Sequence, residues 1–147
     1  MKRRDLTLSG IDAGLPLTGP ETVHVDLMNA CNTNCITCWD HSPFLDAPRP
    51  AAWKGRRART QDVERLLEDL DELGGLRSVI LSGMGEPFLH PGIGEVIAAV
   101  KRRPLHLTII TNLLLADVVT VLGLGVDQLL VGVHAASREA YEAFHPS

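Results

Sequence analysis

The residues with the clearest capacity for chemistry are three cysteines that lie close together. Cys31, Cys35 and Cys38 are all the cysteines of the chain. An odd number of thiols cannot pair completely, so these residues make a poor disulfide framework. Thiolates grouped this closely are better explained by a metal that needs several soft ligands from one loop.

Two kinds of metal centre suit this spacing. Tetrahedral zinc needs a fourth ligand, for which His24 and His41 are the nearest candidates. A [4Fe–4S] cluster can take three thiolates and leave one iron open to another ligand. Structural zinc sites usually pair two CxxC knuckles and only one CxxC is present, so the spacing favours the cluster. A third hypothesis, a thiol redox pair of Cys35 and Cys38, leaves Cys31 without a role.

Glycine-rich or polar groups also follow three further segments that have strand character. They are the motif GMGEP at 83–87, then Asn112, then His134. Glycines let the backbone approach a ligand closely, and the Glu86 carboxylate can pair with an ammonium group. A single Asn at a strand end more often caps a turn, and a His there is at least as often structural.

Alternating strand and helix signals position these residues. Strands are expected at 22–28, 76–82, 105–111 and 126–133, and helices at 60–73, 91–103, 116–122 and from Ser137 onward. Four strand–helix repeats with largely apolar strands indicate an α/β fold with right-handed βαβ units on a parallel sheet. Ligands of such folds bind at the carboxyl ends of the strands, where all the groups above fall. We therefore expect one shared site.

Two segments lack such periodicity. Residues 1–20 contain glycines and prolines, and we interpret them as a loose leader. Residues 42–59 are broken by prolines and rich in Arg and Lys, so we expect a loop. Its charges are most simply a solvated face, and the alternative is a basic rim near an anionic ligand.

Composition narrows the class of protein. The 147 residues are 45% apolar and carry a formal net charge of −4. This predicts one domain with a real core and no nucleic-acid partner. No apolar run is long enough for a membrane span and no apolar stretch follows the basic start, so we expect a cytoplasmic protein without a membrane partner.

CxxxCxxC directly after the first strand, followed by a strand that ends in GMGEP, resembles the radical S-adenosylmethionine (radical SAM) superfamily. The resemblance covers about residues 21–147 and implies a partial TIM-type barrel. The chain would supply roughly four of its six (β/α) units. We therefore interpret 21–147 as an incomplete radical SAM core domain at the N-terminal part of a larger enzyme.

The resemblance implies that Cys31, Cys35 and Cys38 bind three irons of a [4Fe–4S] cluster. The fourth iron would chelate S-adenosylmethionine (SAM), and the reduced cluster would cleave it. The 5′-deoxyadenosyl radical released would abstract hydrogen from an unknown substrate. A low-potential electron donor such as flavodoxin or ferredoxin is the implied partner.

The resemblance also assigns SAM-binding residues. Glu86, with the backbone of Gly83, Met84 and Gly85, would bind the amino group of SAM. The strand end at Asn112 resembles the TNG-type strand end of the family.

Four positions depart from the family pattern, and one of them is Leu113, which follows Asn112 where glycine is common. The family often has a serine and an aspartate where this chain has Gly132 and His134, and His134 could replace one of those contacts. The residue before the third cysteine is usually aromatic but is Thr37 here. Trp39 could cover the adenine instead, and a core position is the equally weighted alternative.

Overall fold

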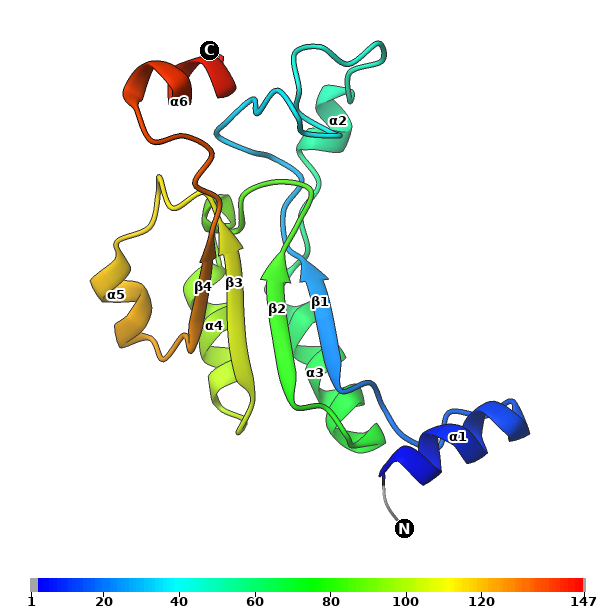
Figure 1. Ribbon diagram of the computed structural model, residues 1–147. Coiled ribbons are helices and arrows are strands. Elements are labelled where there is room, and N and C mark those ends of the chain that lie inside the picture. The colour runs from blue at the N-terminus through cyan, green and yellow to red at the C-terminus, as the bar shows by residue number, and fades with distance from the viewer. Residues whose placement is uncertain (1–2, 147) are drawn as a thin grey trace.

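The computed structural model describes residues 3–146, and its centre is a sheet of four parallel strands in chain order (Figure 1). The strands are β1 (Thr22–Asp26), β2 (Ser78–Ser82), β3 (His106–Thr111) and β4 (Gln128–Val131). Each begins and ends inside its predicted range. Val25 is in register with Leu81, and Leu81 with Ile109, so the apolar rows of neighbouring strands align.

Helices connect successive strands, and α3 and α4 lie against one face of the sheet (Figure 1). They are α3 (Thr60–Leu73), α4 (Ile93–Lys101) and α5 (Val118–Gly123), with the 3₁₀ turn η1 (Pro87–Leu89) before α4 and α6 (Arg138–Phe144) after β4. The helix predicted at 60–73 is confirmed at both ends. It stops at Gly74, whose φ of 67° favours glycine. Its first residue is Thr60, and Arg59 stands at the N-cap position.

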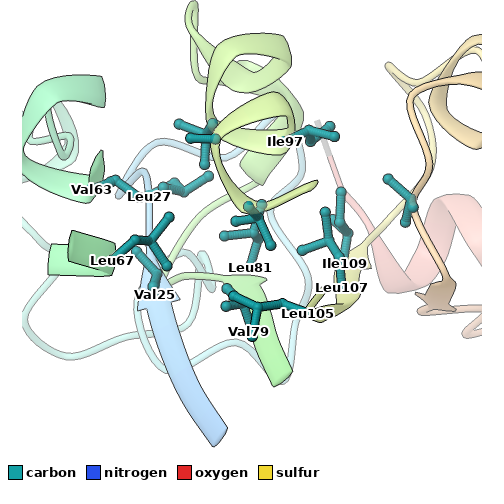
Figure 2. Close-up of a cluster of buried hydrophobic side chains, with 14 of the residues drawn as sticks. Val25, Leu27, Val63, Leu67, Val79, Leu81, Ile97, Leu105, Leu107 and Ile109 are labelled. Carbon is teal, nitrogen blue, oxygen red and sulfur yellow. The ribbon is translucent and has the colours of Figure 1, made fainter. Parts of the chain in front are cut away.

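The core lies between the sheet and these helices (Figure 2). Its fully buried side chains come from the sheet (Leu27, Val79, Leu81, Leu107 and Ile109) and from the helices (Leu67, Val96, Ile97 and Val100). Side chains alternate along each strand, so the same strands present a second set to the opposite face. That face carries polar and apolar side chains: Thr22 bonds Ser78 at 3.1 Å and Thr108 donates to Gln128 at 3.1 Å, while Ile110 and Leu130 are neighbours in register and partly exposed.

The predicted loose leader is wrong, because it contains the helix α1 (Arg3–Ala13). Gly14, with a φ of 65°, ends it in a Schellman motif: Leu15 N donates to Gly10 O and Gly14 N to Ile11 O. No helical period is visible at residues 3–13 because α1 has no continuous apolar face. Its apolar side chains Leu8 and Ile11 are exposed.

The segment predicted as a loop at 42–59 holds the short helix α2 (Ala51–Lys54), which begins after Pro50. Beyond α2 the chain returns to the segment that follows β1, where Arg57 forms an antiparallel β-bridge with Met28. Among the residues described, no helix combines the length and the apolar character needed to cross a bilayer.

A carboxylate at the start of β4 fastens the last strand to the rest of the sheet. Asp127 accepts hydrogen bonds from the Lys101 ammonium at the end of α4 and from the Leu107 amide in β3, both at 2.7 Å. Lys101 also donates to Leu105 O at 2.9 Å. The Lys101 contact first, and the Leu107 amide second, lower the pKa of Asp127 below its ordinary value.

We expect Asp127→Asn to lower the free energy of unfolding at pH 7 by about 1 kcal/mol, a modest value because the pair is partly exposed. A depressed folded-state pKa gives stability that is present above the unfolded pKa, about 3.9, and is lost as pH falls through the folded pKa. The difference from the parent chain should therefore shrink as the pH falls below the unfolded pKa. Urea unfolding at pH 7 and at a pH below the unfolded pKa measures it. Asp69→Asn, at an exposed carboxylate on α3, is the control; an equal loss there would contradict the assignment.

Candidate functional site

The three thiols lie on a loop that follows β1, which we call the cysteine loop (residues 29–42). All three cysteines are free and half-buried. The Thr33 hydroxyl lies 3.3 Å from Cys31 Sγ and 3.5 Å from Cys35 Sγ, so one buried side chain contacts two sulfurs. Cys38 Sγ accepts from the Asp40 amide at 3.5 Å. The loop rises above the carboxyl ends of the strands, between α2 and α6 (Figure 1).

The end of β2 presses directly against this loop. Glu86 N donates to Ala30 O at 2.8 Å. A Cβ on Gly85 would lie 2.0 Å from Ala30 O, which only glycine avoids. Gly83 has a φ of 155°, and a Cβ there would lie 2.9 Å from Met28 O. The predicted close approach of the GMGEP backbone is thus made to the protein's own loop.

The Glu86 side chain is buried and turned inward, with 3% of its surface exposed. Its Oε1 accepts from the Thr111 hydroxyl at 2.8 Å and from Phe88 N at 3.0 Å. Its Oε2 accepts from Asn112 N at 3.0 Å. The carboxylate therefore joins the ends of β2 and β3, a role that the sequence did not reveal. Oε2 takes a single donor and so retains acceptor capacity.

Asn112 extends the same network to the cysteine loop. Its side-chain Nδ2 donates to Asn32 Oδ1 at 2.8 Å, between the first two cysteines. Its Oδ1 accepts from Leu114 N at 3.0 Å, which is the turn-capping role common for Asn. Both interpretations of this residue, turn cap and part of the shared site, therefore describe real contacts.

His41 holds the far end of the loop. Its Nε2 lies 2.8 Å from Asn29 O and 3.0 Å from Met84 O, and it is the donor because carbonyl oxygens only accept. Because this nitrogen donates to backbone carbonyls, it does not serve as a metal ligand. His24 lies on β1 in register with Ile80. The zinc alternative, which needed one of these histidines as fourth ligand, is not favoured.

The end of α6 contacts the loop from the side of β4. Ile36 N donates to Phe144 O at 3.0 Å. The His134 ring stacks on the Phe144 ring with centroids 4.4 Å apart. His134 is therefore linked to the cysteine loop through Phe144. His145 donates from Nδ1 to Tyr141 O at 3.0 Å, and its Nε2 is buried without a partner among the described residues. Sequence reasoning missed Phe144 and His145, because nothing in the short last helix marks them.

Two predicted site residues face solvent. Trp39 is 87% exposed, so the alternative of a core position is wrong, and its role as cover over the adenine stays a prediction. Met84 is 47% exposed, and its carbonyl serves His41. Gly132 leaves room for His134, since a Cβ on Gly132 would lie 3.1 Å from His134 Cε1.

The donor set fits an iron–sulfur cluster, because three thiols stand together on one loop and soft sulfur ligands suit iron. Within residues 3–146 no three Cys, His, Asp or Glu side chains converge closely enough to hold a metal ion. A cluster would therefore have to draw the three sulfurs of the cysteine loop together.

Comparison with known proteins decides the family. The model of the radical SAM superfamily matches residues 25–146, most of the chain. The chain belongs to the radical SAM superfamily. A curated relative, the S-adenosyl-L-methionine-dependent tRNA 4-demethylwyosine synthase of Oryza sativa subsp. japonica, is 28% identical over 137 residues. That match covers 78% of this chain and 20% of the rice protein.

Solved structures share the fold of this radical SAM chain. Streptococcus suis SuiB bound to S-adenosylmethionine matches with a TM-score of 0.59 at 24% identity, over 80% of this chain and 25% of SuiB. BtrN in complex with AdoMet and 2-DOIA matches with a TM-score of 0.58 at 19% identity, over 84% and 50%. The predicted fold, an α/β part of a TIM-type barrel, is confirmed. The chain spans a fifth to a half of the length of these proteins.

The contact of Gly85 with the loop can be tested directly. We expect Gly85→Ala to lower the free energy of unfolding by about 1–3 kcal/mol, because the added methyl forces Ala30 away. Gly94→Ala in α4 is the matched control: nothing lies within 4 Å of its Cβ position, so it should be neutral or stabilising. Urea unfolding measures both. A Gly85→Ala protein as stable as its parent would show that the loop lies elsewhere.

Proposed function

We propose that this chain carries the cluster and methionine half of a radical SAM active site. Cys31, Cys35 and Cys38 would hold one [4Fe–4S] cluster with an open iron for SAM. The supporting observation is that the ends of β2, β3 and α6 each contact the cysteine loop, which itself continues β1. Bound there, such a cluster would supply the electron for reductive cleavage of SAM to a 5′-deoxyadenosyl radical, which would abstract hydrogen from a substrate.

The chain's own residues would prepare the loop for that role. The backbone bonds of Ala30 and Ile36 fix the loop on both sides of the first two cysteines. Thr33, placed between Cys31 and Cys35, can donate its hydroxyl to a thiolate and so stabilise the charged form that binds metal. The loop thus has a fixed base and sulfurs that can move toward a common centre.

Recognition of SAM would fall to the strand ends. The backbone of Gly83, Met84 and Gly85 lies beside the loop and would adjoin the SAM amino group, to which Glu86 Oε2 would offer its remaining acceptor capacity. Asn112, whose backbone N–H donates to the same Glu86 carboxylate, would line the SAM site next to Glu86.

The outer residues would complete the SAM site. Trp39 is free to fold over the adenine because 87% of its surface is exposed. His134 would face the ribose from the end of β4.

The cysteines provide the first test. We expect Cys35→Ala to abolish stoichiometric iron loading in anaerobic reconstitution, whereas the parent takes up about four irons per chain. The parent with dithionite and SAM should form 5′-deoxyadenosine, and Cys35→Ala should form none. Thr37→Ala, at an exposed position in the same loop, is the control and should load normally. A cluster retained without Cys35 contradicts the ligand assignment. A loaded parent that never cleaves SAM contradicts the activity.

Glu86 provides the second test. We expect Glu86→Gln to weaken SAM binding about 10- to 100-fold, because a charge-assisted hydrogen bond contributes about 1.5–3 kcal/mol. Iron content should persist. Glu86→Gln also disturbs the contacts to Thr111 and Asn112, so stability must be measured alongside calorimetric SAM affinity.

Thr111→Val separates the two roles of Glu86. It removes one donor to Glu86 but keeps the carboxylate, so it should lower stability and leave SAM affinity unchanged. If Thr111→Val weakens SAM binding as much as Glu86→Gln does, the carboxylate only supports the turn.

A further inference from the structure

One buried imidazole connects the cysteine loop with the turn that follows β2. His41 has only 6% of its surface exposed. Its Nε2–H is shared between Asn29 O at 2.8 Å and Met84 O at 3.0 Å, so one donor serves two acceptors. Asn29 begins the cysteine loop, His41 lies near its end, and Met84 belongs to the GMGEP turn. A single proton therefore joins both ends of the loop to that turn.

The contacts that Gly85 and Glu86 make with the loop secure only its start. Glu86 N donates to Ala30 O at 2.8 Å, and the close approach of Gly85 is also to Ala30. The three cysteines all follow Ala30, so these contacts alone would leave the sulfur-bearing part of the loop free to swing. His41 closes the loop beyond the third cysteine.

Hydrogen bonds of the next residue transmit the position of His41 to the cysteines. Ser42 N donates to Cys38 O at 3.3 Å, and Ser42 Oγ donates to Ile36 O at 2.8 Å. Ser42 is itself buried. The pair formed by His41 and Ser42 therefore fixes the part of the loop that carries the second and third sulfurs relative to the GMGEP turn.

The helix α2 stands beside this imidazole. The His41 and Trp53 ring centroids are 6.2 Å apart, and Asn29 Nδ2 donates to Trp53 O at 3.1 Å. A hydrogen bond in a buried place is electrostatically stronger than one in water, and its loss leaves the carbonyls of Asn29 and Met84 without that donor. The contact is thus suited to hold two segments at a fixed separation.

We propose that His41 is a positioning residue for SAM, because it sets the distance between the cysteines and the Met84 backbone before SAM arrives. The inference rests on the proposed function, in which SAM is held by the open iron on one side and by the GMGEP turn and Glu86 on the other. A ligand that bridges two segments binds more tightly when they are already held in place, since less conformational freedom is lost on binding. This role requires no contact between His41 and SAM.

The reach of the side chain at position 41 provides the test. The amide nitrogen of Gln can occupy the place of the imidazole Nε2, whereas Asn is one methylene shorter and cannot reach both carbonyls. We expect His41→Ala and His41→Asn to raise the calorimetric Kd for SAM about tenfold, and His41→Gln to stay within about twofold of the parent. Iron content should stay at the parent's level in all three variants, because the cysteines are unchanged.

His90 is the matched control for stability. It is likewise buried, its Nε2 lies 2.7 Å from Ala58 O, and its Nδ1 accepts from Gly92 N at 3.1 Å. None of these partners belongs to the cysteine loop or to the GMGEP turn. We expect His90→Ala and His41→Ala both to lower the free energy of unfolding in urea, but only His41→Ala to weaken SAM binding.

Two further measurements on His41 separate positioning from a general loss of structure. In dithionite-driven formation of 5′-deoxyadenosine, His41→Ala should raise the KM for SAM and leave kcat within about twofold, because a lost preorganising contact weakens ground-state and transition-state binding alike. In the chain without a cluster, NMR of isotope-labelled histidines should show a His41 Nε2 proton that exchanges slowly with solvent. That signal should vanish in His41→Gln, which identifies it.

Several outcomes overturn the proposal. It fails if His41→Ala binds SAM as tightly as the parent, if His41→Gln is no better than His41→Asn, or if His90→Ala weakens SAM binding equally. Loss of iron from His41→Ala would make His41 a support for the cluster alone, and a rapidly exchanging Nε2 proton would show that the shared hydrogen bond does not form. A parent that takes up iron but binds no SAM refutes the proposed function itself, and with it any role of His41 toward SAM.

Discussion

The arrangement of the site depends on one buried negative charge. A carboxylate removed from water must be matched by donors, and Glu86 finds them in Phe88 N, the Thr111 hydroxyl and Asn112 N. Two of these donors belong to the end of the next strand, so satisfying the charge fixes the ends of β2 and β3 relative to one another. The backbone N–H of Glu86 then fixes Ala30, and with it the start of the cysteine loop.

The strands and the long helices could be predicted because each shows its own apolar period. The helix at 60–73 has Val63, Leu67 and Leu70 on one buried face and a left-handed glycine at its end. The N-terminal helix has no such face, since its apolar residues Leu8 and Ile11 are exposed, and among the glycines and prolines of residues 1–20 its stop residue Gly14 does not stand out. A four-residue helix such as α2 is too short to show any period.

The position of the site could be predicted, because it follows from the order of strands and loops along the chain. Parallel strands put their carboxyl ends on one edge, so the cysteines, Glu86 and Asn112 had to gather there. The hydrogen-bond partners could not be predicted, because they join residues that only the folded chain brings together. For example, the sequence makes His41 a candidate zinc ligand, whereas in the fold its ring donates to the carbonyls of Asn29 and Met84. The two departures at Gly132 and His134 belong together, since the ring occupies the space that a side chain at 132 would need.

The long reach of the contacts on the cysteine loop has a consequence for biosynthesis. Asn32 is bonded to Asn112, 80 positions later, and Ile36 to Phe144 in the last helix. During translation the three thiols leave the ribosome long before these partners exist, so the loop has no fixed base at first. Contacts between distant segments form late in folding. The thiols therefore pass through a period of full exposure, when oxidation competes with metal uptake, and iron–sulfur delivery is best timed after β3 has joined the sheet.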